Sequence, residues 1–363
     1  MGDLGSTPLL YAARPALALD GRAEENLAIG LLSLSVTETT EGLFTCEAAF
    51  GNWGSAGGGI GFLYFDRQVL EFGRRFAVDV GAGDAAARVF EGRITGIEGR
   101  FPQSRPPELL VLAEDRFQDL RMVRRSRAFE DVSDRDVFER IAGQHGLRTD
   151  LDVDGPTHRL LAQVNQSDLA FLRERARAVD ADLWLDGDTL HAQARSRRRH
   201  AEVTLTYGQG LLELSVLADV AQQRTRLTVS GWDVQAKEGI EREGDEAAVQ
   251  GELDGGAGGA SVLADRFGQR PERIVHLVPL SSQEAQQLAE ACYRRMARRF
   301  VTGQGLCEGD GRIRAGTHLR LQGLGDLFDG RYYVTEVRHT FDLAAGLRTQ
   351  FRVERPGLGG GGR

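Results

Sequence analysis

Apolar and polar residues alternate with a period of two in several short segments at both ends of the chain. The segment 31–36 reads Leu-Leu-Ser-Leu-Ser-Val, and segments 76–80 and 349–353 alternate in the same way. This period is typical of a β-strand with one buried face. Glycine-containing steps at 81–84 and 323–326 follow such segments and favour turns. The pattern predicts short antiparallel strands joined by turns.

The strand-like segments recur in the same order in the two ends of the chain. Segments 31–36 and 211–216 are identical at five of six positions, and each precedes a second strand-like segment and a tryptophan, Trp53 or Trp232. Further matches pair Phe44–Phe50 with Arg226–Ser230, 76–84 with 318–326, 91–95 with 329–335 and 108–113 with 348–353. Internal repeats indicate duplicated structural units, so we predict two similar β-domains, at 1–122 and 201–356.

The segment 123–200 has a different, helical period. Ser133 followed by Asp136 predicts a capped helix start, and Ser167 predicts a second one. Apolar residues then recur at the spacing of one helix face. Residues 183–191 carry Asp-Gly-Asp between two apolar runs, which indicates a tight hairpin. We predict a small α+β module over 123–200.

The second β-domain contains extra sequence between its matched halves. Residues 236–272 are charged and glycine-rich, so we expect a mobile insertion there. Ser281 and Glu284 form a capping-box pattern that starts a helix at about 282–300. The glycine-rich residues 357–363 predict a flexible tail. The fold class is therefore α+β and β-dominated, with two tube-like antiparallel β-barrels joined by the small α+β module.

The length, composition and net charge of the chain exclude several classes of protein. The chain has 363 residues, of which 41% are hydrophobic and 27% charged, so it is long enough for two or three folded domains. No apolar run reaches the roughly 18–20 residues of a membrane helix, and the N-terminus lacks a secretory pattern. The net charge of −8 argues against specific nucleic-acid binding. We expect neither a membrane partner nor a specific nucleic acid.

The candidate catalytic and cofactor-binding motifs lack the neighbouring residues or elements that their chemistry requires. Lys237 is the only lysine and lies outside any Gly-Lys-Ser/Thr motif, which excludes a P-loop. The Gly81-x-Gly83 step is followed by a strand pattern and not by the helix that dinucleotide binding requires. An acidic run at 150–155 lacks the final glutamate of a calcium loop, since that position is Leu161. We therefore predict no catalytic residue, no cofactor and no metal.

Arginines cluster in three places, at 121–127, 195–199 and 294–299. Two interpretations stay open for these clusters. They are either solvated charge on linkers and helix ends, or an ion-pairing surface for an acidic neighbouring subunit or a lumen lining.

The segment 163–176, with its Asn-x-Ser-Asp-x-x-Phe-Leu core, resembles the signature of the phage late control D family. That family is similar to the hub portion of VgrG proteins and to the tail hubs of contractile phages. The resemblance extends over 17–355. The residues that carry it, as structural motif positions, are Asn165, Ser167, Asp168, Phe171, Leu172, Trp184, Gly231, Trp232, Gly330 and Tyr333.

The resemblance implies a non-enzymatic baseplate hub of a contractile injection system or phage tail. It implies a homotrimer whose two tube-like barrels per chain form a pseudo-sixfold ring between the hexameric tail tube and the trimeric spike. The implied partners are the tail tube protein, a separate spike protein, because the sequence stops after the second barrel, and other baseplate proteins. Assembly in the bacterial cytoplasm is implied as well. Two alternatives remain, a tail-tip enzyme such as a cell-wall hydrolase and a β-rich carbohydrate-binding module.

Overall fold

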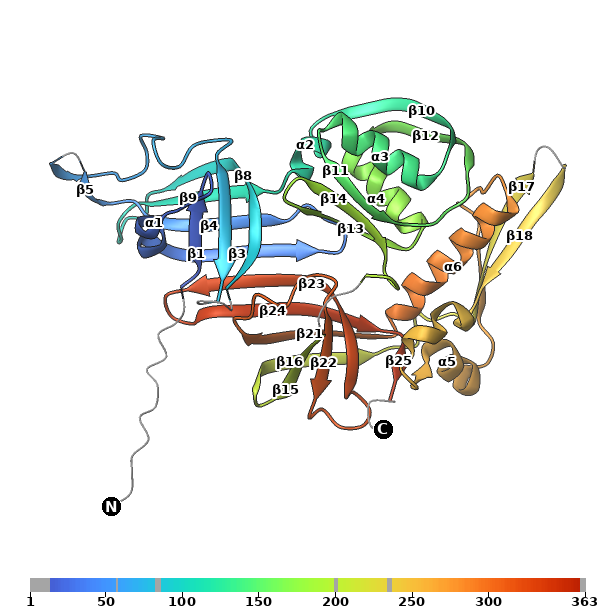
Figure 1. The fold of residues 1–363 in the computed structure, drawn as a ribbon. Helices are drawn as coiled ribbons and strands as arrows, with labels where there is room; N and C mark the ends of the chain where they lie inside the picture. Colours follow the sequence, from blue (N-terminus) through green and yellow to red (C-terminus); the bar gives the residue numbers. More distant parts are fainter. Residues whose placement is uncertain (1–13, 57, 82–85, 199–201, 234–236, 360–363) are drawn as a thin grey trace, which may run out of the picture.

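The computed structural model describes residues 14–56, 58–81, 86–198, 202–233 and 237–359 (Figure 1). Strands outnumber helices, so the predicted β-dominated class is confirmed. The largest sheet has thirteen strands, in the order β2-β1-β7-β8-β9-β4-β3-β23-β22-β15-β16-β21-β24. β23 also pairs with β24, which closes six of these strands into a barrel.

The first half of the sheet is an N-terminal six-strand unit, and it contributes most of one hydrophobic core. Its strands are β1 (Ala16–Leu19), β3 (Leu31–Thr39), β4 (Thr45–Gly51), β7 (Arg75–Val80), β8 (Ala87–Arg100) and β9 (Glu108–Glu114). The short strand β2 (Arg22–Ala23) and helix α1 (Glu25–Gly30) connect β1 to β3. β5 (Gly54–Ala56) and β6 (Gly59–Gly61) form an arm that projects from the unit between β4 and β7 (Figure 1).

The closed barrel is the C-terminal six-strand unit, and it encloses a second core. Its strands are β15 (Glu202–Tyr207), β16 (Gly210–Ala218), β21 (Val301–Glu308), β22 (His318–Gln322), β23 (Gly330–Asp342) and β24 (Gly346–Arg355). Apolar residues alternate inward along these strands, as the period of two requires.

The two six-strand units have the same strand order. If the strands of each unit are numbered along the chain, both sheets run first, fourth, fifth, sixth, third, second. In the C-terminal unit the first and second strands also pair, through β15 and β16. Among the described residues of the N-terminal unit, β1 and β3 form no ladder with each other. The two units therefore share a topology, and one of them is closed by hydrogen bonds.

Irregularities in the strand pairing fall at matching positions of the two units. The β8–β9 register shifts between Ile94 and Gly96, and the β23–β24 register shifts between Val334 and Glu336, 240 residues later. At each shift a threonine hydroxyl lies 3.4 Å from a carbonyl oxygen of the neighbouring strand, with Thr95 on Leu112 and Thr335 on Arg352. Because β-bulges are built features of a sheet, this match extends the likeness beyond strand order.

One predicted correspondence between the halves is wrong. The sequence pairs Phe44–Phe50 with Arg226–Ser230, but β17 (Arg226–Asp233) lies outside the barrel, in a separate sheet with β18 and β20. The strand that occupies the position of β4 is β21, and both pair with their unit's second strand across a matching register shift. The reason is that residues 219–300 are inserted between β16 and β21. The first strand of this insertion, β17, has the alternating pattern expected of the barrel strand that follows β16, so the sequence alone did not distinguish it from β21.

The insertion is larger and more ordered than the mobile loop predicted at 236–272. Its elements are β17, β18 (Glu238–Gly244), the 3-10 helix η2 (Glu246–Glu252), β19 (Ala257–Gly258), α5 (Gly259–Phe267), β20 (Pro271–Ile274) and α6 (Ser282–Arg298). Ser281 accepts a hydrogen bond from the Glu284 backbone N–H, so the predicted start of α6 is confirmed. The first residues of the predicted flexible tail form β25 (Gly357–Leu358), which pairs with β19, whereas 360–363 lie outside the described residues.

A compact module with its own hydrophobic core lies between the two units in the sequence. Its elements are α2 (Phe117–Arg121), β10 (Arg124–Val132), α3 (Asp134–Gln144), β11 (Arg148–Asp152), β12 (His158–Ser167), α4 (Asp168–Ala178), β13 (Ala181–Asp186) and β14 (Thr189–Ala194). The capping box at Ser133 and Asp136 is confirmed, as are the Ser167 cap and the 183–191 hairpin.

The units are joined by a ladder between β3 and β23, which pairs seven residues of each strand from Glu336–Thr39 to Asp342–Ser33. Beside this ladder the buried Glu38 accepts a 2.5 Å hydrogen bond from Arg314 Nε. Burial raises the pKa of Glu38 even though Arg314 and the Ala315 backbone N–H oppose this effect. The carboxylate of Glu38 is thus satisfied across the joint, whereas Nε2 of the buried His339 on β23 has no hydrogen-bond partner among the described residues.

Gly92 offers a test of the packing inside the N-terminal unit. A Cβ at this β8 position would lie 2.2 Å from the Glu114 carbonyl oxygen, a backbone atom that cannot easily move. We expect Gly92→Ala to lower the free energy of unfolding by about 2 kcal/mol or more. Urea denaturation followed by circular dichroism measures this loss.

The matched control is Gly239→Ala in β18, where a Cβ meets no atom within 4 Å. This variant should stay within about 0.5 kcal/mol of the parent. Equal stability of the two variants would contradict the described packing.

Candidate functional site

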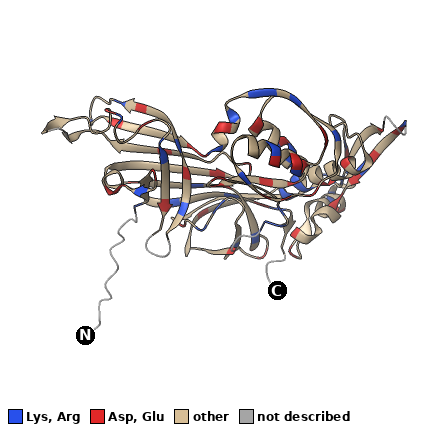
Figure 2. Ribbon diagram, turned by 45° about the horizontal axis from the view of Figure 1, so that its top comes forward, with Lys and Arg blue, Asp and Glu red and all other residues tan. Residues whose placement is uncertain are grey.

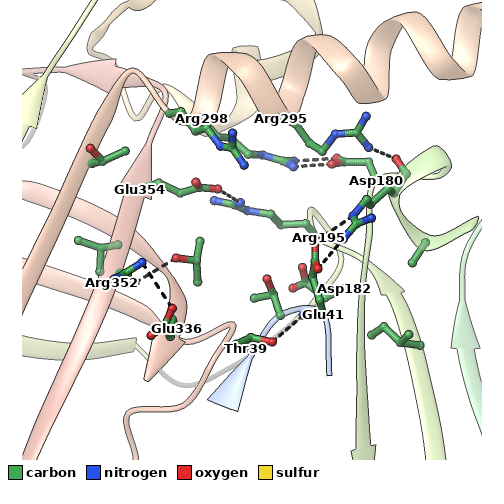
Figure 3. Close-up of a pocket in the computed structure, with 18 of the residues that line it drawn as sticks. Thr39, Glu41, Asp180, Asp182, Arg195, Arg295, Arg298, Glu336, Arg352 and Glu354 are labelled. Atoms are coloured by element: carbon green, nitrogen blue, oxygen red, sulfur yellow. Dashed lines mark hydrogen bonds and ion pairs between the residues drawn. The ribbon is translucent and has the colours of Figure 1, made fainter. Parts of the chain in front are cut away.

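A charged groove lies where the two units, the middle module and the insertion meet (Figure 3). Its cavity of ≈ 670 Å³ is bounded by the β3–β4 turn, α4, the end of α6 and the outer faces of β16, β21, β23 and β24. Seven arginines line it, namely Arg173, Arg177, Arg195, Arg295, Arg298, Arg299 and Arg352. Five acidic residues line it as well, namely Glu41, Asp180, Asp182, Glu336 and Glu354.

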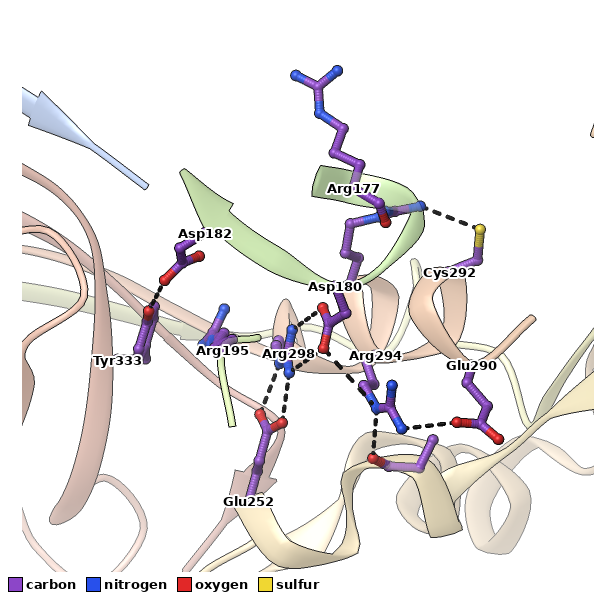
Figure 4. Close-up of polar contacts among 12 residues, drawn as sticks. Arg177, Asp180, Asp182, Arg195, Glu252, Glu290, Cys292, Arg294, Arg298 and Tyr333 are labelled. Carbon is purple, nitrogen blue, oxygen red and sulfur yellow. Dashed lines mark hydrogen bonds and ion pairs between the residues drawn. The ribbon is translucent and has the colours of Figure 1, made fainter. Parts of the chain in front are cut away.

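Arg298 is the centre of this junction and is 1% exposed. It extends from the last turn of α6 and donates to both oxygens of Asp180, at 2.5 and 2.8 Å. It also donates to both oxygens of Glu252, at 2.7 and 2.6 Å (Figure 4). The planar guanidinium suits two bidentate partners, which a lysine could not satisfy in this way.

The partners of Arg298 come from two other parts of the chain. Asp180 follows α4 with a positive φ of 54°, a backbone conformation that turns the chain sharply into β13. Glu252 is the last residue of η2 in the insertion. Burial raises the pKa of Glu252, but the hydrogen bonds and charge of Arg298 outweigh burial and lower that pKa overall. Burial likewise opposes the charge of Arg298, and its two acidic partners raise the Arg298 pKa well above the usual value.

A second set of contacts joins the middle module to the barrel. The Tyr333 hydroxyl of β23 donates to Asp182 of β13 (Figure 4). Arg198 donates to the same carboxylate oxygen at 3.0 Å. Arg195 forms an ion pair with Glu354 of β24, and its guanidinium carbon lies 3.6 Å from the centre of the Tyr333 ring. These contacts combine charge pairing with cation–π packing at a buried interface.

His158 clamps α6 to the middle module. Its Nε2 lies 3.1 Å from Asp134 Oδ2 of α3, and its Nδ1 lies 3.3 Å from Glu284 Oε1 of α6. Burial lowers the pKa of His158, but the hydrogen bonds with Asp134 and Glu284 prevail and raise it to about 9. The imidazolium is therefore the form that bridges the two carboxylates at neutral pH.

Five of the predicted motif residues lie together in the middle module. Ser167 caps α4, and buried Asp168 receives Arg127 at 2.6 Å and contacts His145 at 2.9 Å. Phe171 stacks on Phe129, and Leu172 is fully buried. Asn165 has a positive φ of 49°, and its backbone N–H donates to Ser126. This part of the motif builds a core and a helix start.

The other motif residues fall in three places. Trp184 and Tyr333 lie at the junction, since Arg198 lies 3.9 Å over the Trp184 ring and also binds Asp182, the partner of Tyr333. Gly330 begins β23 with a φ of 142°. Gly231 and Trp232 belong to β17, away from the groove, and a Cβ on Gly231 would meet the Pro279 carbonyl oxygen at 2.4 Å.

Several junction residues were not identified from the sequence, chiefly Asp180 and Glu252. The clusters at 195–199 and 294–299 were the available signal, and Figure 2 shows that basic and acidic residues are mixed over most of the ribbon. Within the described ranges, the structure pairs Arg195, Arg197, Arg198, Arg294 and Arg298 with acids of this same chain. The pairing is long-range, as the sequence separation of 118 positions from Asp180 to Arg298 illustrates.

No candidate metal centre emerges from the part of the chain that the structure describes, because no three His, Cys, Asp or Glu residues gather there suitably. Within the same residues, no helix has the length and apolarity needed to cross a membrane.

The fold is shared with solved tail proteins. The 43 kDa tail protein of prophage MuSo2 from Shewanella oneidensis has a TM-score of 0.68 at 15% identity, covering 94% of this chain and 98% of that one. A tail protein from Neisseria meningitidis MC58 has a TM-score of 0.66 at 12% identity, covering 96% and 98%. The E. coli c3393 protein, described as a component of the type VI secretion system, has a TM-score of 0.56 at 13% identity, covering 93% and 76%. At these identities the likeness establishes the fold.

The sequence itself gives a family. A family model described as the Alg8 N-terminal domain matches residues 61–342, and the chain belongs to that family. No curated protein matches the sequence. The matched region includes the middle module, the insertion, strands β7, β8 and β9 of the N-terminal unit and every strand of the C-terminal unit except β24.

Replacing Arg298 tests the junction. Arg298→Leu leaves Asp180 and Glu252 without their shared cation, and we expect a loss of about 3–5 kcal/mol in the free energy of unfolding because a buried ion pair is broken on one side. Urea denaturation measures this loss. Arg299→Leu is the matched control, since Arg299 is exposed on the same helix end, and it should change stability by no more than about 0.5 kcal/mol. A loss in Arg298→Leu no larger than in the control would refute this role.

The His158 clamp predicts a pH dependence. The folded-state pKa of about 9 exceeds the ordinary value of 6.5, so the stabilisation is fully present below pH 6.5 and is lost as pH rises through 9. His158→Gln should therefore cost about 2 kcal/mol at the lower pH and much less above the folded pKa. Denaturation curves measured across this pH range test whether the stabilities of the variant and the parent converge at high pH.

Proposed function

We propose that this chain is a structural baseplate hub of a contractile injection system or phage tail. In this role three copies form a pseudo-sixfold ring that joins a hexameric tail tube to a trimeric spike. The observation that carries the proposal is the identical strand order of the two six-strand units, with matching register shifts. Two similar units in each of three chains present six similar faces, which resolves the mismatch between sixfold and threefold symmetry.

The proposal also covers the architecture of the two six-strand units. Both six-strand units are tube-like barrels, at 1–122 and 201–356, and the module at 123–200 holds them at a fixed spacing. The late control D and VgrG-like resemblance supports this reading, as does the shared fold of solved tail proteins. In this reading the ten motif residues are structural positions. The partners are the tube protein, a separate spike protein and other baseplate proteins, assembled in the bacterial cytoplasm.

The chemistry of the groove supports a structural role over a hydrolytic one. A general acid needs a carboxyl group whose pKa is raised within reach of substrate. In the groove each acidic residue is paired with an arginine, as Glu41 is with Arg177 and Glu354 with Arg195. Burial raises the pKa of Glu41, but the Arg177 hydrogen bond and nearby positive charges lower it overall.

Aromatic side chains gathered where the β5–β6 arm leaves the N-terminal unit support a role in assembly. Trp53 and Phe62 pack edge to face at 5.3 Å, and Phe62 lies 4.9 Å from Phe65 and 6.2 Å from Phe101. Phe101 is 65% exposed. Contiguous apolar surface of this kind is typical of protein interfaces.

Mass measurement tests the proposed ring. Analytical ultracentrifugation of the chain, alone and with candidate tube and spike proteins, should give a homotrimer or a complex with three copies of this chain. We expect Trp53→Ser combined with Phe62→Ser to weaken that association roughly tenfold or more, because the arm loses its apolar contacts. Phe267→Ser on α5, also exposed, should leave it unchanged. A chain that stays monomeric with every tail partner would refute the hub.

A further inference from the structure

Three arginines in the groove have no carboxylate partner among the described residues. Arg173 donates to the carbonyl oxygens of Glu41 and Gly42, at 2.8 and 2.9 Å. Arg295 donates to the Arg177 carbonyl oxygen and contacts Cys292 Sγ. Arg299 is exposed, and no hydrogen bond or ion pair of its side chain occurs within the described ranges. Carbonyl partners carry no full negative charge, so these guanidinium groups feel nearby acids such as Glu41 only through space and form no ion pair with them among the described residues.

The acidic residues of the groove, in contrast, are all engaged by arginines. Glu41, Asp180 and Glu354 pair with Arg177, Arg298 and Arg195, respectively. Asp182 pairs with Arg198 at 3.0 Å, and Glu336 lies 3.7 Å from Arg352. The excess positive charge acts inside the groove, because Arg173 and Arg295 both help to lower the pKa of Glu41.

The groove is long. The cavity of ≈ 670 Å³ shares Leu217, Arg295, Arg299 and Thr302 with a second cavity of ≈ 390 Å³. At its other end it shares Ser215, Gln304, Glu336 and Arg352 with a third cavity of ≈ 450 Å³ that follows the outer face of the barrel. The three cavities therefore adjoin one another along the surface, and Arg295 and Arg299 line both the first and the second.

We propose that this groove binds an extended acidic peptide segment of a partner protein, through carboxylates placed opposite Arg173, Arg295 and Arg299. Leu217 is 60% exposed in the same channel and gives an apolar contact for a side chain of the segment. Charge complementarity carries the choice of ligand, since an arginine without an internal acid is free to form a charge-assisted hydrogen bond with an external one.

A nucleic acid fits the groove less well than a peptide. A nucleic-acid strand carries a negative charge at every phosphate and would meet Glu336, Glu354 and Asp219 along the channel. Strand binding without sequence preference also uses exposed aromatic rings for stacking, whereas Phe351, which lines the third cavity, is 3% exposed. A peptide can place its carboxylates opposite the arginines and leave neutral residues elsewhere.

The test uses the full chain and a fluorescein-labelled peptide of about twelve residues that repeats Glu-Ser-Glu-Leu. Fluorescence anisotropy should show binding that weakens when salt is raised, because the contact is electrostatic. Arg299→Glu, and Arg295→Glu with Arg299→Glu, should weaken binding roughly tenfold or more. Arg159→Glu is the matched control, since Arg159 is an exposed arginine on β12 outside the groove, and it should bind as the parent does.

Three outcomes with the peptide would overturn the inference. They are absence of binding by the parent chain, equal binding of a peptide with Gln in place of Glu, and equal binding by Arg299→Glu and the parent. Tighter binding of a single-stranded oligonucleotide that is lost in the same variants would assign the groove to nucleic acid and also overturn it. Thermal melting of each variant confirms that folding is intact.

The inference rests on the proposed function only for the source of the segment, another component of the tail. Peptide binding is measured on the isolated chain, so it can fail while the trimer forms, and the trimer can fail while the peptide binds.

Discussion

The architecture depends on one long strand, β23, which pairs with strands of both six-strand units. Its first residues pair with β22, and the residues from Glu336 onward pair with β3 along the same edge. Its other edge pairs with β24 and closes the barrel. Backbone groups of a buried strand must find partners, so the end of β23 that extends past β22 requires β3. The N-terminal unit is thereby held in a defined register against the barrel.

The charged junction adds a second constraint, which acts through side chains. A buried charge is costly unless it is paired and hydrogen-bonded. Arg298 satisfies Asp180 of the middle module and Glu252 of the insertion at once, and Tyr333 and Arg198 share Asp182. The near absence of lysine in the sequence fits these sites, because planar guanidinium groups satisfy two carboxylates in ways that an ammonium group does not.

Local signals in the sequence predicted local structure well. Ser133 and Ser167 were identified as helix caps because a capping residue and its backbone partner lie within three positions. The pairings between residues far apart in the sequence could not be predicted from local patterns. Arg226–Ser230 has the alternation of a barrel strand, yet the insertion places β21 in the position that corresponds to β4. The groove was equally hidden, because the partners of Arg298 lie on other elements and no periodicity links them.

The position of the insertion has a consequence for how such a chain can diversify. In the N-terminal unit the step from the second to the third strand, β3 to β4, is a short turn, whereas in the barrel the same step holds residues 219–300. The flanking strands keep the same ladder and the same register shift in both cases. Elaboration at a hairpin end therefore leaves barrel closure untouched, and this end can gain or lose whole elements while the strands hold. Loss of the insertion would also remove Arg298, the cation that holds Asp180 of the middle module. The insertion and this acidic site must therefore vary together.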